Sequence, residues 1–307
     1  MPTEVPLQRV SFYDEIARNK RNSWLLVVFV TAIILALVGA FGYLYFPEIA
    51  FLMLVVAFVF VLIDVFVSFQ YGDQIVLRSV GAVPADDVKH RYYVDTVEGL
   101  AIAAGIPKPK IYVMQSPEIN AFATGKDPKN ASVCVTTGAL EKLSRQELEG
   151  VLGHEMSHIA NYDIRFAMLL AVLVGLVAIL SYMFLRSLRG VGSSGGGGDR
   201  KGGGAFIAIL VFAIVLAILA PFVTRLAQAS ASRQREFLAD ASGARLTRYP
   251  EGLAGALTKI KKHNAGKMDV NEAVSHLFFQ DPTHSALDAL YATHPNIDER
   301  IKKLQAM

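Results

Sequence analysis

Two histidines and a glutamate lie within one helical turn in the segment LEGVLGHEMSHIANYDIRF, residues 148–166. His154 and His158 are four residues apart, so on a helix both imidazoles lie on one face, about 5–6 Å apart, and can bind one metal ion. Glu155 lies about 100° further round the helix, where it can contact a water on the metal rather than the metal itself. H-E-x-x-H with this division of roles is typical of zinc hydrolases, in which the glutamate is the general base.

A catalytic zinc site of this kind needs a third protein ligand and keeps a fourth position open. Glu236, in the segment SRQREFLAD, is the best candidate, and Asp240 lies four residues later on the same helical face. A carboxylate that orients a ligating histidine is a regular part of zinc sites. The alternative is a solvated helix face on which Arg233 and Arg235 pair with the two acids. The nearby H-E-x-x-H motif favours the metal site.

The motifs H-E-M-S-H and R-E-F-L-A-D resemble those of the HtpX-type membrane zinc metalloproteases, gluzincins related to the CAAX-processing endopeptidases. The resemblance covers nearly the whole chain, including FYDEIARNKRNSWLL, INAFATGKDPKNASVCVTTGAL and THPNIDERI. It implies one zinc ion per chain, bound by His154, His158 and Glu236, with Glu155 as catalytic base.

The resemblance also implies roles for residues outside the two motifs. Asp240 would hydrogen-bond His154. His294 and Arg300 would stabilise the oxyanion, and a donor or cation at a developing negative oxygen is usually the largest single catalytic term. The strand edge that receives an extended protein substrate would carry Asn120, Ala121 and Phe122. The remaining histidines fit no ligand spacing and are expected at the surface: His90, His263, His276 and His284.

Four apolar stretches predict that the site is anchored in a lipid bilayer. Of the 307 residues 53% are hydrophobic, and a helix of about 20 apolar residues spans a membrane. Such spans are predicted at about 24–46, 49–69, 166–185 and 205–223. The first is too long for a signal peptide and lies too far from the start of the chain, so we expect it to be retained. Asp64, near one end of the second span, is a functional candidate for which we favour a partnered or interfacial role.

The spans divide the chain into parts: a cytoplasmic leader (1–23), a transmembrane hairpin (24–70), a first catalytic part with H-E-x-x-H (71–165), a second span pair (166–223) joined by the glycine-rich loop 186–204, and a second catalytic part with the third ligand (224–307). Helical periodicity and a few short alternating runs predict a mainly α fold. The expected architecture is a four-span helical membrane protein with a gluzincin-like α+β metalloprotease domain that carries a small β-sheet.

Local signals predict the elements that position the motifs. A helix in VKHRYYVDTVEGLAIAAG should end at Gly105, KIYVMQS and ASVCVTTG alternate like strands, and NAFATGKDPKN between them has turn residues. Ser144 and Glu147 form a capping box at the start of the H-E-x-x-H helix. The helix with Glu236 has no breaker before Gly243. We expect both metal-bearing helices to continue unbroken into membrane spans.

Charge predicts the orientation. Arg18, Lys20 and Arg21 precede the first span, and the positive-inside rule then places the leader in the cytoplasm. Because His154 and Glu236 must share one side, spans three and four should cross and return, with loop 186–204 outside although it is basic. The alternative is a hairpin that dips into the bilayer without crossing it.

The expected function is that of a zinc metalloendopeptidase in the cytoplasmic (inner) membrane, with the active site facing the cytoplasm. Its substrates would be misfolded or damaged membrane proteins, in quality control and stress response. One alternative is a specific processing protease of the CAAX type, which should have more than four spans. Another is a non-enzymatic scaffold with structural zinc, which normally has four protein ligands.

The net charge and the cysteine content bear on nucleic-acid binding and on disulfide bonds. The net charge of +3 is small and spread along the chain, so nothing indicates a nucleic-acid partner. The single cysteine, Cys134, excludes an internal disulfide framework and is expected to be a small buried residue. The oligomeric state stays open.

Overall fold

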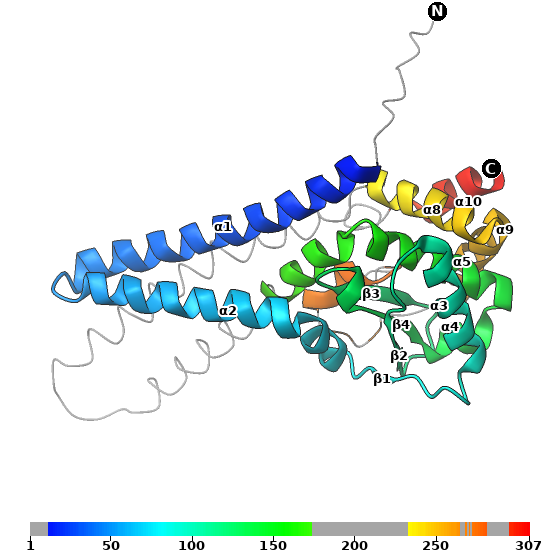
Figure 1. The fold of residues 1–307 in the computed structure, drawn as a ribbon, viewed down its shortest axis with the longest axis horizontal. Coiled ribbons are helices and arrows are strands. Elements are labelled where there is room, and N and C mark those ends of the chain that lie inside the picture. The colour runs from blue at the N-terminus through cyan, green and yellow to red at the C-terminus, as the bar shows by residue number, and fades with distance from the viewer. Residues whose placement is uncertain (1–11, 174–232, 265–267, 269, 271, 281–294) are drawn as a thin grey trace, which may run out of the picture.

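The computed structural model describes residues 12–173, 233–264, 268, 270, 272–280 and 295–307. Two long helices form a hairpin that projects from a part containing the sheet and the other helices (Figure 1). The predicted loop 186–204, span 205–223 and most of span 166–185 lie outside the described residues. The described part therefore bears on two of the four predicted spans.

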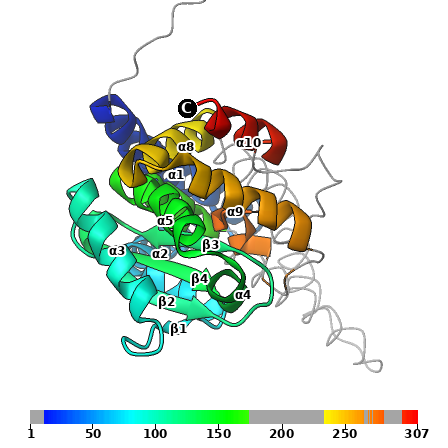
Figure 2. The ribbon, with the colours of Figure 1, turned by 90° about the vertical axis from the view of Figure 1, so that its right-hand side faces the viewer.

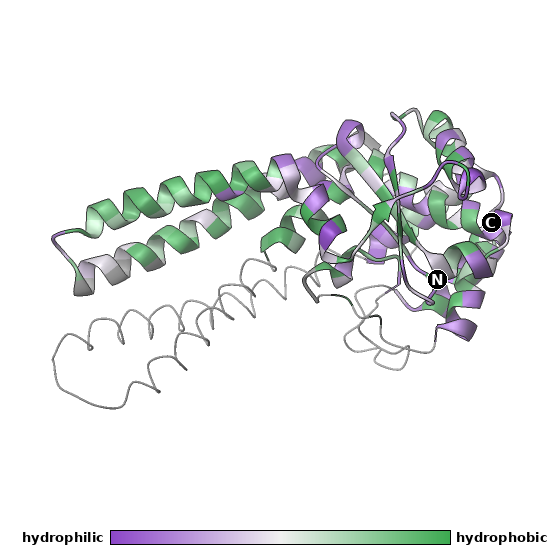
Figure 3. Ribbon diagram, turned by 90° about the horizontal axis from the view of Figure 1, so that it is seen from below, coloured by the Kyte–Doolittle hydropathy of each residue, from purple (hydrophilic) through white to green (hydrophobic). Residues whose placement is uncertain are grey.

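The hairpin consists of α1 (Phe12–Tyr45) and α2 (Ala50–Ser79), which pack side by side. Within them Ile16–Ala36 and Ala50–Ser79 are long and apolar enough to cross a membrane. Large apolar side chains point outward, such as Phe51 with 80% exposure, and hydrophobic residues cover most of the hairpin (Figure 3). An apolar surface of this extent suits lipid rather than water. This supports the first predicted span pair, although both helices run beyond its bounds.

The sheet has four strands in the order β1-β2-β4-β3: β1 (Val83–Pro84), β2 (Lys110–Met114), β3 (Ala121–Gly125) and β4 (Ala131–Thr136). β2 runs parallel to β4, and β3 runs antiparallel to it at the edge of the sheet. The two strands predicted from alternation, β2 and β4, are confirmed.

The segment in which turn residues were noted contains both a strand and a turn. Its first half forms β3, and the turn is confined to a short 3₁₀ helix, η1 (Pro128–Asn130), where Asp127 accepts hydrogen bonds from the backbone N–H groups of Lys129 and Asn130. Gly125 has φ 138°, and a Cβ there would lie 2.3 Å from the Asn130 carbonyl oxygen. A glycine is therefore required where β3 turns into η1.

The described helices outside the hairpin pack against the sheet and against one another. α3 (Arg91–Ala104) ends at Gly105 with φ 68°, as predicted. The remaining helical elements are α4 (Thr137–Lys142), α5 (Arg145–Ala160), α8 (Arg233–Thr247), α9 (Pro250–His263), η2 (Glu272–Leu277) and α10 (Ile297–Gln305). α5 lies between the sheet on one side and α8 and α9 on the other (Figure 2).

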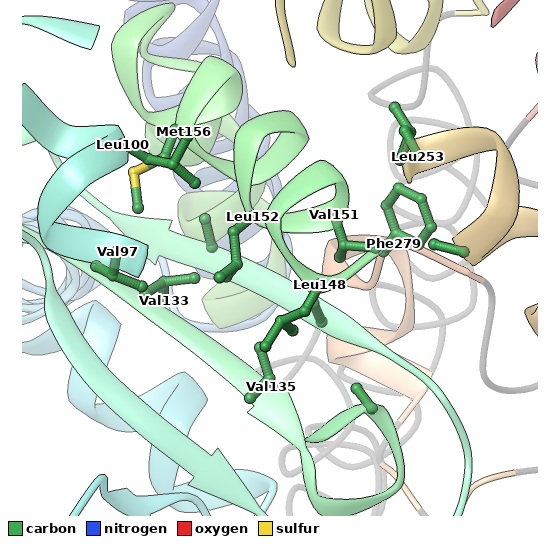
Figure 4. Packing of buried hydrophobic residues seen from close by; sticks show 14 of the residues in the cluster. Val97, Leu100, Val133, Val135, Leu148, Val151, Leu152, Met156, Leu253 and Phe279 are labelled. Atoms are coloured by element: carbon green, nitrogen blue, oxygen red, sulfur yellow. The ribbon is translucent and has the colours of Figure 1, made fainter. Parts of the chain in front are cut away.

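A continuous apolar core fixes α5 in this central place (Figure 4). Leu148, Leu152 and Met156 of α5 pack in one cluster with Val97 of α3 and Val133 of β4. Leu152, Met156 and Val133 are 0% exposed, and truncating one such side chain typically costs about 2–5 kcal/mol of folding free energy. The predicted capping box is confirmed: Ser144 Oγ accepts from the Glu147 backbone N–H, and the Glu147 carboxylate accepts from the Ser144 N–H.

The expectation that α5 continues unbroken into a span is wrong. α5 ends at Ala160 with Asn161 as its C-cap, and Tyr162 adopts a left-handed φ of 61°. Helix resumes over 163–173. Because a single left-handed residue redirects the chain, Asp163 begins a new helical segment instead of continuing the spiral of α5.

Gly243 does not end α8, which continues to Thr247. A Cβ at Gly243 would lie 2.7 Å from the His154 backbone nitrogen. The glycine therefore permits close approach of α8 to α5, which brings Glu236 of α8 toward the histidines.

Candidate active site

Three predicted ligands converge between α5 and α8. The ligand atoms of His154, His158 and Glu236 all lie within 4.8 Å of one another. The two Nε2 atoms are 3.0 Å apart, and the Glu236 carboxylate oxygens lie 3.6 Å from Nε2 of His154 and 3.7 Å from Nε2 of His158. Two imidazole nitrogens and one carboxylate around a common point form a donor set that fits a metal ion such as zinc.

Asp240 lies behind the first histidine. Its Oδ1 is 2.9 Å from Nδ1 of His154, so Nδ1 donates its proton there and the Nε2 lone pair remains for a metal. Burial lowers the pKa of His154 to about 4, although the hydrogen bond to Asp240 opposes that shift. The neutral imidazole, which is the metal-binding form, therefore prevails at neutral pH.

The alternative of a solvated α8 face does not hold. Glu236 and Asp240 are 5% and 3% exposed. The Nη1 atom of Arg235 lies 3.9 Å from the carboxylate of Asp163. Both acids face inward because α8 packs against α5 along this side.

Arg300, on α10, is fully enclosed behind the site with 1% exposure. Its Nε and Nη2 donate to the two oxygens of Asp240 at 2.8 and 2.7 Å, and Nη1 lies 3.7 Å from Glu236 Oε2. Burial raises the pKa of Asp240, but the charge of Arg300 and the hydrogen bonds from His154 and Arg300 together outweigh burial and lower that pKa to about 2. The guanidinium thus contacts both the ligand Glu236 and Asp240, the partner of His154. Its predicted oxyanion partner, His294, lies outside the described residues.

The second histidine has a carboxylate partner that sequence reasoning missed. Asp163 Oδ2 lies 2.9 Å from Nδ1 of His158. Burial lowers the pKa of His158, but the hydrogen bond to Asp163 and the charge of Glu236 outweigh it and raise the pKa to about 9. On an unbroken helix residue 163 would lie away from residue 158. The left-handed turn at Tyr162 instead places the carboxylate beside His158.

A pocket opens beside the three ligands, and Glu155 lies in its wall with 2% exposure. The pocket is lined by Ala123, His154, Glu155, His158, Asp163, Ile164, Ala167, Arg235, Glu236, His276, Leu277, Phe278 and Phe279. The expectation that His276 lies at the surface is wrong: it is 7% exposed, and its Nε2 lies 3.1 Å from the Ala167 carbonyl oxygen. Helical spacing alone did not reveal it because His276 comes from η2, far from both motifs.

The edge of β3, predicted to receive substrate, is paired with residues 278–280 of the same chain, which we call the edge segment. The Ala121 carbonyl accepts from the Phe279 N–H at 2.8 Å. The Asn120 side chain accepts from the Gln280 N–H at 3.1 Å and donates to the Gln280 carbonyl at 2.7 Å. Phe122 forms an antiparallel bridge with Phe278. Asn120, Ala121 and Phe122 are consequently at most 2% exposed.

Comparison with known proteins agrees with this geometry. Residues 88–307 match peptidase family M48. A "Protease HtpX homolog" of Caldanaerobacter subterraneus subsp. tengcongensis is 43% identical over 97% of this chain and 98% of its own length, and one of Thermoanaerobacter pseudethanolicus is 41% identical over 98% and 99%. The crystal structure of S. mikatae Ste24p covers 94% of this chain and 66% of its own, with 21% identity and a TM-score of 0.48. The chain therefore belongs to peptidase family M48 and is a membrane metalloprotease of the HtpX type.

Proposed function

We propose that this metalloprotease is a zinc-dependent endopeptidase that cleaves misfolded or damaged membrane proteins at the cytoplasmic face of the inner membrane. The observation that carries the proposal is the convergence of His154, His158 and Glu236 beside a pocket whose wall contains Glu155. Three protein donors next to a pocket favour a catalytic zinc over a structural one, which four protein ligands would enclose.

Individual residues of the chain have separate roles in peptide hydrolysis. When bound, zinc would polarise the scissile carbonyl and lower the pKa of a water molecule. Glu155 accepts a proton from that water as the new C–O bond forms, and it returns the proton to the departing amine nitrogen as the C–N bond breaks. Asp240 keeps the proton of His154 on Nδ1, away from the metal-facing Nε2.

The membrane hairpin supports the location. α1 begins and α2 ends beside the sheet-containing part (Figure 1), so a crossing hairpin leaves this part on one side of the bilayer. Arg18, Lys20 and Arg21 lie in the first turns of α1. Basic residues flanking a span favour the cytoplasmic side, and we propose that the active site faces the cytoplasm.

We also propose that protein substrates bind as an added strand on β3. The hydrogen-bonding groups of Asn120 and Ala121 are the ones that such a strand would use, and they are engaged by the edge segment. A substrate must therefore displace Phe279 and Gln280 from this edge. Unfolded segments suit this mode because only an extended backbone can pair with a strand.

Cleavage of casein by the purified protein in detergent tests the proposal. Glu155→Gln should abolish cleavage while zinc remains bound, because it removes the base and no ligand. Glu155→Gln cleaving at the parent rate would exclude Glu155 as base. X-ray absorption spectroscopy at the zinc edge counts the donor atoms on the metal. Four protein donors would support a structural zinc and overturn the proposal.

A further inference from the structure

The first helix of the membrane hairpin reaches the metal site directly. Asn19, in the second turn of α1, is 1% exposed. Its Nδ2 donates to Asp163 Oδ1 at 2.6 Å and to the Asn161 carbonyl oxygen at 2.9 Å. The Lys20 ammonium lies 4.1 Å from the centre of the Tyr162 ring. The start of α1 therefore packs on the turn that follows α5, residues 161–163.

Each oxygen of Asp163 has one close hydrogen-bond donor, and Arg235 Nη1 lies farther away, 3.9 Å from Oδ1. Oδ1 accepts from Asn19 and Oδ2 accepts from His158 Nδ1. A carboxylate held by one donor can rotate about its side-chain torsions, whereas one held at both oxygens has a fixed plane. Asn19 thereby fixes the direction in which Asp163 faces His158.

The chemistry around Asn19 indicates why an amide is present. Both of its neighbours, the Asp163 carboxylate and the Asn161 carbonyl, are acceptors, so only the NH₂ end of the amide can face them. Its Oδ1 is buried and has no hydrogen-bond partner among the described residues. Burying an amide with one end unsatisfied is unfavourable. An apolar side chain would have served for helix packing alone, so the two acceptors, Asp163 and the Asn161 carbonyl, account for an amide donor at this position.

We propose that Asp163 and Asn19 are positioning residues for the ligand His158, and that Asn19 couples the first membrane span to the metal site. This inference rests on the proposed function only in assuming that His158 binds the metal. Asp163 keeps the His158 proton on Nδ1 and so directs Nε2 to the metal. Asn19 acts one step further out by holding Asp163. Partners of this kind typically change metal affinity by 10–100-fold.

Zinc affinity, measured by chelator competition on the full chain in detergent, tests the proposal. Asp163→Ala should weaken zinc binding by about 10–100-fold. Asn19→Ala should weaken it by roughly three- to tenfold, the usual range for one lost hydrogen bond. Asn19→Asp should be worse than Asn19→Ala, since it places a second carboxylate against Asp163.

The geometry of the ligands can be followed separately from folding. In the cobalt-substituted protein, Asn19→Ala and Asp163→Ala should both change the visible absorption bands of the ion, which report ligand arrangement. Asn19→Ser, whose hydroxyl can still donate, should restore part of the parent affinity. Its binding remaining as weak as that of Asn19→Ala would mean that the donor is not what matters.

Ser23 provides the matched control. It lies one turn along α1 from Asn19, is equally buried at 1%, and bonds the Asn19 carbonyl at 2.8 Å without touching Asp163. Ser23→Ala should leave zinc affinity unchanged. A loss in Ser23→Ala equal to that in Asn19→Ala would assign the effect to docking of the helix and overturn the proposal.

A double-mutant comparison tests whether Asn19 acts through Asp163. In the Asp163→Ala background, Asn19→Ala should have no further effect on zinc affinity, because its route to His158 is already removed. The same loss in both backgrounds would show that Asn19 acts independently of Asp163, which contradicts the proposal. A parent chain that binds no zinc would refute the proposed function, whereas normal zinc binding in every Asn19 and Asp163 variant would refute this inference alone.

Discussion

His154 and His158 lie one turn apart on α5, yet they are supported from opposite ends of the chain. His154 is 1% exposed and contacts Asp240, which Arg300 of α10 holds through two hydrogen bonds. The His158 side chain is 17% exposed and contacts Asp163, which is bonded to Asn19 of the membrane hairpin. The partner of His154 is therefore held by an ion pair within the sheet-containing part, and the partner of His158 by an amide from the helix that continues into the first span.

The difference has an energetic consequence. The His154 support is a buried arrangement of charges, so losing one partner leaves another charge uncompensated in a dry place. In the His158 support, Asp163 is hydrogen-bonded to a neutral amide and lies 3.9 Å from Arg235, so losing one partner costs less than losing a close bidentate ion pair. We therefore expect the first support to determine stability as well as metal binding. The second should affect metal binding with a smaller effect on the fold.

Removing Glu236, the ligand that lies close to both histidines, should have the largest effect. Glu236 lies within 3.7 Å of both Nε2 atoms, so Glu236→Ala leaves only two protein donors. We expect loss of bound metal and of peptidase activity together, measured by metal analysis of the purified variant and by casein cleavage. Metal content equal to that of the parent would remove Glu236 from the site.

The contrast between the two supports is tested by comparing Asp240→Ala with Asp163→Ala. Asp240→Ala leaves Arg300 buried without its bidentate partner, and we expect it to lower the free energy of unfolding by about 3–5 kcal/mol. Asp163→Ala should lower it by less, about 1.5–3 kcal/mol, the range for lost hydrogen bonds to a charged group. Thermal unfolding of the metal-free proteins in detergent, with Ser23→Ala as a reference, measures both. Equal losses would mean that the two supports do not differ in kind.

Sequence reasoning succeeded where a local rule decides the outcome. The i, i+4 spacing put His154 and His158 on one face, the capping box started α5 at Arg145, and Gly105 ended α3. Glu236 and Asp240 were found because they share one face of a single helix. Each of these expectations depends on a repeat of 3.6 residues or on a terminal hydrogen bond, and neither requires tertiary contacts.

Sequence reasoning failed where tertiary contacts override the local pattern. Asp163 was missed because periodicity assumes an unbroken helix, whereas Tyr162 takes φ 61° and interrupts the helix. Gly243 is the first helix breaker after Glu236 in the sequence, but it lies inside α8 at a contact point with the His154 backbone. His276 was placed at the surface because no spacing links η2 to α5. Asn19 lies in the predicted leader, 144 residues from Asp163, and no motif joins the two.

The smallest effect expected is on the His154 side, where the edge segment places the Phe279 ring 4.9 Å from the His154 ring. Gln280→Pro removes the N–H that donates to Asn120 and spares Phe279, so it should loosen the segment without disturbing the ligand. Gln280→Ala keeps that N–H and is the matched control.

If substrate competes for β3, kcat/KM for casein should rise roughly two- to tenfold in Gln280→Pro, the range for one hydrogen bond, mostly through a lower KM. It should stay at the parent value in Gln280→Ala. A Gln280→Pro variant with parent metal content and unchanged or lower kcat/KM would show that substrate binds without displacing this segment, and the β3 edge would then not be the docking strand.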